Sequence, residues 1–262
     1  MIVVLYVIAA LIGISLGLIG AGGAIVAVPA FVYLAGISPT LASGYALFVV
    51  TVASAVGSAQ YVQKKLVDWR SVLAFGSTTL LSIAIVRRFI LPSIPASFVA
   101  WPSTFVLQRD TTLMVAFAAV LMAASVGMLR KRETRVPAGP THVGRLAFFG
   151  LVIGVVSGFL GVGGGFLMTP ALVLWAGLDM RRAVGTSLVL ITANSAVGVV
   201  SDLSRGAIYD WPFVLVFTAI TTAGIVAGTY LSHRIDSTKL KAGFGWFVLA
   251  IGIAVMLREL LY

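Results

Sequence analysis

Long apolar runs separated by short polar segments make up almost the whole chain. Crossing the ~30 Å hydrocarbon core of a bilayer as a helix takes roughly 17–25 residues, and eight runs are that long or nearly so. They are residues 1–20, 41–62, 71–86, 111–129, 146–160, 183–200, 213–231 and 242–257. The pattern predicts an all-α, polytopic helical membrane protein with about eight spans and little chain left for any soluble domain.

The amino-acid composition supports a membrane protein and argues against nucleic acid as a binding partner. Of the 262 residues, 60% are hydrophobic and 10% are charged, whereas about 25% of a soluble domain is charged. The formal net charge is +10, but the basic residues sit mostly in short loops, which favours a role in membrane topology over nucleic-acid binding. No basic segment precedes the first apolar run, so we expect a retained helix rather than a cleaved signal peptide.

The chain carries an internal repeat. Residues 17–29 read GLIGAGGAIVAVP and residues 158–170 read GFLGVGGGFLMTP. Aligning 17–57 with 158–198 without gaps gives 41 pairs, of which 17 are identical. The sequence therefore predicts a duplicated unit: a first membrane repeat over 1–130, a cytoplasmic linker over 131–143 and a second membrane repeat over 144–262.

Loop charges favour an inverted duplication. Because Lys and Arg in short loops mark the cytoplasmic side, we place the basic linker inside. Lys64 and Lys65 then lie inside as well, and so do Arg181 and Arg182 if the segment around the second glycine cluster enters and returns on one side. If that segment crosses once, those arginines fall outside. The hairpin interpretation predicts inverted repeats with both termini outside.

Each glycine cluster ends a long helix and starts a short one. The pieces that follow, 24–34 and 165–175, hold about 11 residues and are too short to span. A helix that begins inside the membrane points free N–H groups and the positive end of its dipole into the break, which suits an anion. Two such breaks near the midplane are typical of secondary transporters. The candidate site residues here are Gly20, Gly22, Gly23, Gly161, Gly163, Gly164 and Gly165.

Close helix packing is the alternative explanation for glycine in a membrane helix. We assign Gly13 and Gly17, together with Gly150, Gly154 and Gly158, to packing, because they recur at the four-residue spacing that lets helices approach closely. An adjacent pair of glycines is not needed for that purpose. The clusters themselves therefore favour a functional break.

These motifs resemble those of a known family. The paired clusters, each followed by a proline and then by an A-x-G-[TY]-[SA]-L segment at 42–47 and 183–188, are similar to the TauE/SafE family of sulfite and organosulfonate exporters. The resemblance covers essentially the whole chain and implies a multi-spanning permease of the bacterial inner membrane for small sulfur oxyanions that does not hydrolyse ATP. The first half departs from the pattern, with Ala24 in place of the third glycine and Tyr45 where the second half has Thr186. We therefore expect two unequal half-sites.

Polar side chains within the spans extend the candidate site. Hydroxyls and an amide can donate to an oxyanion and still release it. The alternative is that each hydroxyl bonds a carbonyl of its own helix. Arg87 and Arg88 can bind an oxyanion or extend to the membrane surface, and both explanations stay open. The added candidates are Ser43, Thr51, Thr186, Ser187, Thr192, Asn194, Arg87 and Arg88.

Other chemistry is not expected. Both histidines, His142 and His233, lie in loops, and the chain has no cysteine, so we predict neither an enzyme nor a metal or other cofactor. All eight acidic residues fall in loops or at helix ends, and we therefore expect no carboxylate inside the membrane. This favours export of a small anion driven by membrane potential through alternating access. An anion channel, a proton-coupled carrier of another anion and a homodimer remain open, and the expected partners are the anionic substrate and the lipid bilayer.

Overall fold

Helices form nearly all of the structure. The computed structural model describes residues 2–19, 23–94, 97–100, 105–129, 143–160, 164–232 and 237–261. In chain order the elements are α1 (Ile2–Ile19), α2 (Gly23–Tyr33), α3 (Pro39–Gln63), α4 (Trp69–Ile85), the π-helix η1 (Val86–Ile90), α5 (Leu91–Ser93), β1 (Ser97–Ala100), β2 (Phe105–Gln108), α6 (Arg109–Leu129), α7 (Val143–Leu160), α8 (Gly165–Trp175), α9 (Met180–Leu203), α10 (Trp211–Ser232) and α11 (Ser237–Leu261).

The predicted helical class is confirmed. Each of the eight apolar runs coincides with a helix, namely α1, α3, α4, α6, α7, α9, α10 and α11. Among the described residues, four helical segments are long and apolar enough to cross a membrane: Pro39–Gln63, Trp69–Ser93, Met180–Leu203 and Trp211–Leu231. Shorter apolar helices occupy Val4–Leu18, Thr111–Gly127 and Gly144–Leu160. An antiparallel hairpin, β1 paired with β2 from Ser97↔Gln108 to Ala100↔Phe105, is the one strand pairing in the described part.

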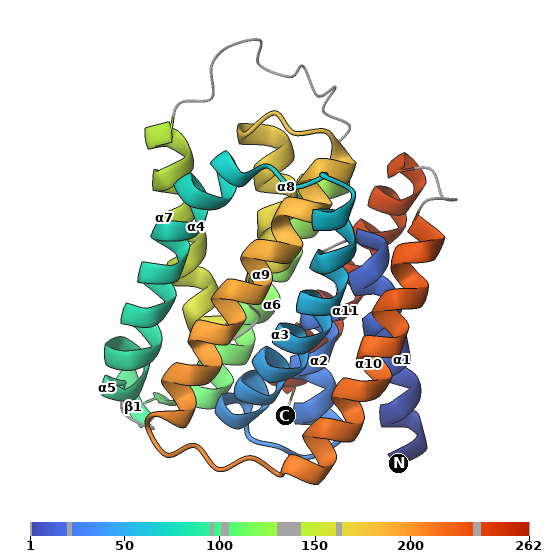
Figure 1. Ribbon diagram of the computed structural model, residues 1–262. Coiled ribbons are helices and arrows are strands. Elements are labelled where there is room, and N and C mark those ends of the chain that lie inside the picture. The colour runs from blue at the N-terminus through green and yellow to red at the C-terminus, as the bar shows by residue number, and fades with distance from the viewer. Residues whose placement is uncertain are drawn as a thin grey trace.

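Two helices form the centre. Of the long apolar segments, α3 and α9 are the most buried, and they cross each other in the middle of the molecule (Figure 1). The surrounding helices contact each other in corresponding pairs: α1 packs on α10 as α7 packs on α4, and α6 packs on α11. Each partner in one half of the chain thus has a counterpart in the other.

The short helices lie where the sequence predicts them. The predicted piece 24–34 is α2, and 165–175 is α8. In Figure 1, α1 starts at the lower edge and α2 returns toward it, whereas α7 starts at the upper edge and α8 returns toward that one. We call the lower edge, where α1 begins and α9 ends, the terminal end, and the upper edge, where α7 and α9 begin, the linker end. Of the cluster glycines, Gly20, Gly22, Gly161 and Gly163 lie outside the described residues, as do residues 130–142 of the linker region.

Local signals explain the helix boundaries, and they recur in both halves. Asp68 caps α4 by accepting from the Ser71 amide, and Asp179 caps α9 by accepting from the amides of Arg181 and Arg182. Gly36 and Gly177, 141 positions apart, have φ of 69° and 65° in the turns that follow α2 and α8.

Glycines in the long helices allow close packing, as predicted. A Cβ on Gly13 would lie 2.1 Å from the Thr221 carbonyl oxygen of α10, and one on Gly17 would lie 2.4 Å from that of Ile225. On the other side of the molecule, a Cβ on Gly154 would lie 2.8 Å from the Thr79 Cα of α4. Backbone atoms cannot rotate out of the way, so these two interfaces depend on the absence of a side chain.

We expect Gly13→Ala to destabilise the protein by about 1–3 kcal/mol, because the added methyl group forces α1 away from α10. Gly127→Ala is the matched control, since no described atom lies within 4 Å of the position of its added Cβ. Thermal unfolding of the detergent-purified protein measures both. Equal melting temperatures for the two variants would contradict the packing role of Gly13.

Candidate functional site

The helix α8 begins in the interior of the protein, and its backbone geometry there is well defined. Gly164 is its N-cap, with φ 72° and no hydrogen bond from a capping side chain. The amides of Leu167 and Met168 both donate to the Gly164 carbonyl at 3.0 Å, so the helix begins here. The positive φ suits glycine, and a glycine at this position has no side chain of its own to cap the amides of the first turn.

A buried hydroxyl lies beside this terminus. A Cβ on Gly164 would come within 2.2 Å of the Ser157 Oγ on α7. Ser157 is 3% exposed, and its hydroxyl has no hydrogen-bond partner within the described ranges. Sequence reasoning missed this residue because it attributed the neighbouring glycines of α7 to packing. Its signal was a polar side chain one position before Gly158 and close to the break.

Asn194 of α9 reaches the same place. Its Oδ1 accepts from the Thr79 hydroxyl at 3.2 Å, and its Nδ2 lies 3.8 Å from the Met168 sulfur. The Met168 methyl group would lie 2.9 Å from a Cβ on Gly164. Asn194 is fully buried, so the structure brings this predicted residue to the start of α8, together with Thr79, which sequence reasoning did not find.

Two predicted residues of α9 connect it to neighbouring segments. The Ser187 Oγ accepts from the Thr169 hydroxyl of α8 at 2.8 Å, next to Met168. The Thr186 hydroxyl accepts from the Asp68 amide at 2.9 Å, just as the Tyr45 hydroxyl of α3 accepts from the Asp210 amide at 2.8 Å. Thr186 thus tethers the loop before α4, and Tyr45 performs the same task for the loop before α10.

The remaining predicted hydroxyls line the contact between α3 and α9. Thr51 donates to the Leu47 carbonyl and Thr192 to the Leu188 carbonyl, at 2.7 and 2.8 Å. The alternative considered for them, a bond to their own helix, is therefore present. The Thr192 Oγ1 also lies 2.9 Å from the Ser54 Oγ across the interface, so these groups form part of the link between the two central helices.

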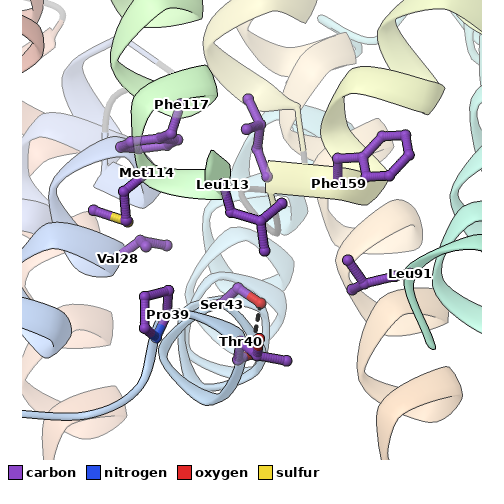
Figure 2. Close-up of a pocket in the computed structure, with 10 residues that line it drawn as sticks. Val28, Pro39, Thr40, Ser43, Leu91, Leu113, Met114, Phe117 and Phe159 are labelled. Atoms are coloured by element: carbon purple, nitrogen blue, oxygen red, sulfur yellow. Dashed lines mark hydrogen bonds between the residues drawn. The ribbon is translucent and has the colours of Figure 1, made fainter. Parts of the chain in front are cut away.

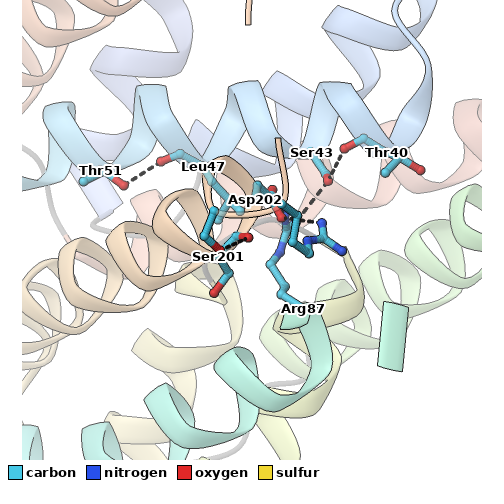
Figure 3. Close-up of polar contacts among 9 residues, drawn as sticks. Thr40, Ser43, Leu47, Thr51, Arg87, Ser201 and Asp202 are labelled. Atoms are coloured by element: carbon cyan, nitrogen blue, oxygen red, sulfur yellow. Dashed lines mark hydrogen bonds and ion pairs between the residues drawn. The ribbon is translucent and has the colours of Figure 1, made fainter. Parts of the chain in front are cut away.

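The two neighbouring arginines point to different surroundings. Arg87, in η1, is 1% exposed; it forms an ion pair with Asp202 of α9 and donates to the Ser43 Oγ at 3.0 Å (Figure 3). Arg88 is exposed. The structure therefore does not bring them together as one bidentate pair, and the charged group that it places inside the protein is Arg87.

Asp202 is a carboxylate at a helix end that is nevertheless buried in the protein. Its position in the last turn of α9 was correctly identified, yet the residue is only 4% exposed. Arg87 binds one carboxylate oxygen, and Arg205 donates to the other at 3.0 Å. Burial is tolerated because two guanidinium groups compensate the charge, and the closer partner, Arg87, lies 115 positions away in the chain.

A small cavity lies between this ion pair and the end of α7. It has room for about one water molecule. Figure 2 shows Ser43 and Thr40 of α3 on one side, Met114 and Phe117 of α6 on another, and Phe159 of α7 across from them. Leu160, the last residue described before the second glycine cluster, also lines it. The cavity thus connects the neighbourhood of the broken helix with Ser43, the hydroxyl to which Arg87 donates.

The described residues provide no candidate metal centre, because nowhere in them do three His, Cys, Asp or Glu side chains gather. The polar groups described around the start of α8 are neutral donors, whereas the charged groups lie at the end of α9. Both arrangements suit an anion held by N–H and O–H groups.

Comparison with known proteins identifies the family. The family model for "Sulfite exporter TauE/SafE" matches residues 5–255. A probable membrane transporter protein of Xylella fastidiosa is 29% identical over 260 residues, covering 95% of this chain and 92% of the relative. Bacillus subtilis YunE, also a probable membrane transporter protein, is 29% identical over 255 residues and covers 91% of both chains. A third relative, "Sulfite exporter TauE/SafE family protein 3" of Arabidopsis thaliana, is 31% identical over 104 residues, covering 39% of this chain and 21% of its own.

No solved structure gives a significant match. The family model nevertheless spans almost the whole chain, and its members are membrane transporters rather than enzymes. With its apolar helices, this chain is embedded in a membrane. It belongs to the TauE/SafE family of membrane transporters.

Proposed function

We propose that the protein exports small sulfur oxyanions, sulfite or a small organosulfonate, and holds the anion at the N-terminus of α8. The observation that carries this proposal is the helix start at Gly164, which has no side chain of its own to cap it and beside which the Ser157 hydroxyl is buried without a described partner. A helix N-terminus offers N–H groups and about half a positive charge, and Ser157 adds an O–H donor. Asn194 and Ser187 lie close behind them.

The same neutral donors suit a transporter better than a tight binding protein. An oxyanion held by hydroxyls and backbone amides exchanges water for similar hydrogen bonds, so it can enter and leave. The family description names sulfite export, and so does the name of the Arabidopsis relative. Sulfite and organosulfonates share the tetrahedral or pyramidal oxygen arrangement that several convergent donors bind. This is the basis for the proposed substrate class.

We also propose that the two halves are inverted repeats that exchange conformations during alternating access. Supporting this are the corresponding helix contacts and the opposite directions of the α1–α2 and α7–α8 hairpins (Figure 1). Trp69 and Trp211 begin equivalent helices and are 55% and 42% exposed, as tryptophans are at the two surfaces of a bilayer. Eight spans plus two half-helices is the arrangement that follows.

Basic residues orient this arrangement. In the described helices and loops, the linker end carries Lys64, Lys65, Arg70, Arg145, Arg181, Arg182, Lys239 and Lys241, whereas the terminal end carries the smaller set Arg87, Arg88, Arg109, Arg205 and Arg258. By the positive-inside rule the linker end is cytoplasmic and both termini are outside. An inside-negative potential then drives anion export, with ~2.3 kcal/mol per charge per 100 mV. Asp202 is already matched by two arginines, so it does not demand a coupled proton.

We expect proteoliposomes containing the purified protein to take up labelled sulfite or a small organosulfonate when an imposed potential drives anions in the transport direction. Uptake should saturate with concentration, because a carrier binds one anion per cycle. A pH gradient without a potential should produce little uptake. Uptake that requires the pH gradient would instead support proton coupling, and uptake that does not saturate would support a channel. If no oxyanion moves under either gradient, the proposed substrate class is wrong.

Gly164→Ala should reduce this uptake roughly tenfold or more, since a methyl group at φ 72° is strained and would occupy the space of the Ser157 hydroxyl. Gly36→Ala is the matched control. It imposes a similar backbone strain at φ 69°, but no described atom lies within 4 Å of its Cβ. Comparable uptake by the two variants, at equal amounts of folded protein, would show that the start of α8 does not hold the anion.

A further inference from the structure

We propose a second anion-binding site at the terminal end, formed by Arg87, Arg205 and Tyr209, in which the Asp202 carboxylate occupies the place of the transported anion. This inference rests on the proposed function, since it gives the exported oxyanion a second binding site beyond the start of α8. The anion displaces Asp202 from Arg87, and Asp202 keeps Arg205 as its partner. We call these four residues the arginine cluster.

The arginine cluster has more donors than acceptors. Arg87 and Tyr209 are 1% and 4% exposed. In the part of the chain that the structure describes, the Nε of Arg87, the Nε of Arg205 and the Tyr209 hydroxyl are buried without a hydrogen-bond partner. Buried donors without acceptors are unfavourable and uncommon in folded proteins. Three of them around a single carboxylate indicate a place prepared for additional acceptor oxygens.

Its charge points the same way. Two guanidinium groups face one carboxylate, so the cluster carries one excess positive charge; the Arg87 side chain is buried, and that of Arg205 is 24% exposed. Buried charge is costly unless an opposite charge balances it. A monovalent oxyanion would supply both the missing negative charge and the missing acceptor oxygens. A guanidinium group can bind two oxygens of one such anion through two parallel hydrogen bonds.

The polar groups converge at a position where the chain has no side chain. A Cβ on Gly44 would lie 2.7 Å from the Tyr209 hydroxyl oxygen and 3.2 Å from an Asp202 carboxylate oxygen. Gly198, on the facing helix, leaves room for Leu47, whose Cδ1 would lie 2.8 Å from an added Cβ, whereas the Arg87 Cδ would be in ordinary contact with that Cβ at 3.6 Å. Gly44 therefore makes space for the polar end of the arginine cluster.

Ser43 links the arginine cluster to a small cavity that also borders the end of α7. Ser43, which accepts from Arg87, lines the small cavity that reaches Phe159 and Leu160 at the end of α7. The start of α8 lies just beyond, with Ser157 on the same turn of α7 as Leu160. An anion leaving Gly164 toward the terminal end meets Ser43 and then Arg87, where it competes with a carboxylate of the same charge.

The first test is Asp202→Asn, which frees Arg87 and Arg205 while preserving the shape of the side chain. Sulfate and methanesulfonate, added to the detergent-purified variant, should stabilise it against heat at roughly tenfold lower concentrations than they stabilise the wild type. Tyr209→Phe in this background should weaken the effect several-fold, because it removes one donor. The exposed variants Arg182→Gln and Asp179→Asn, an i,i+3 pair at the other end of α9, should match the wild type.

The double variant Arg87→Gln/Asp202→Asn guards against misfolding, since it removes both partners and leaves neither charge unpaired. It should remain folded and lose the anion-dependent stabilisation that Asp202→Asn gains. If the double variant keeps that stabilisation, or if Asp202→Asn binds no more tightly than the wild type, the arginine cluster is a structural ion pair and the inference is overturned.

Transport separates this inference from the proposed function. Asp202→Asn in proteoliposomes should saturate at lower oxyanion concentration and turn over more slowly than the wild type, because the anion meets no competing carboxylate. If the wild type transports oxyanions and Asp202→Asn has unchanged kinetics, the second site fails while the proposed function stands. If the wild type transports none but Asp202→Asn gains anion-dependent stabilisation, the binding site stands and the proposed function fails.

Discussion

An interrupted helix inside an apolar protein sets the main constraint on this structure. Backbone N–H groups that face hydrocarbon are too costly to leave open, so the end of a short helix such as α8 has to be enclosed by protein or to line a polar space. The central crossing of α3 and α9 provides that enclosure. Ser187 and Asn194 of α9 contact α8 through Thr169 and Met168, so the same helix that supports the break also supplies its polar lining.

Enclosure in turn requires close contact between helices that have no hydrophobic driving force for association in lipid. Glycines meet this need at the periphery, where α1 meets α10 and α7 meets α4 with backbone against backbone. In the centre, hydrogen-bonded hydroxyl pairs such as Ser54 and Thr192 hold α3 and α9 together. The outer helix pairs are therefore fixed by close backbone packing, while the polar contacts between α3 and α9 can be replaced by other hydrogen bonds with a small change in free energy.

Signals that are local in the chain made much of the fold predictable. Apolar runs of span length gave the eight helices, the glycine clusters gave the boundaries of α2 and α8, and the four-residue glycine spacing gave the tight interfaces. The candidate site was less accessible because it depends on which side chains meet. Ser157 is an ordinary serine until Gly164 is placed beside it, and Asp202 at a helix end gives no sign that Arg87, 115 positions earlier, will enclose it. Single hydroxyls such as Thr51 were equally ambiguous, since bonding to the own helix leaves no mark in the sequence.

The arginine cluster has no twin in the other half of the chain. The turn after α9, where the Ala207 amide donates to the Asp202 carbonyl, matches the turn after α3, where the Leu66 amide donates to the Tyr61 carbonyl, so Tyr61 takes the place of Asp202. In a cycle that interchanges the conformations of two repeats, a contact available at one end lowers the energy of only one of the two end states. In the proposed alternating-access cycle, this contact would favour the state of the empty carrier that is sealed at the end of α9, and that state would be its resting state.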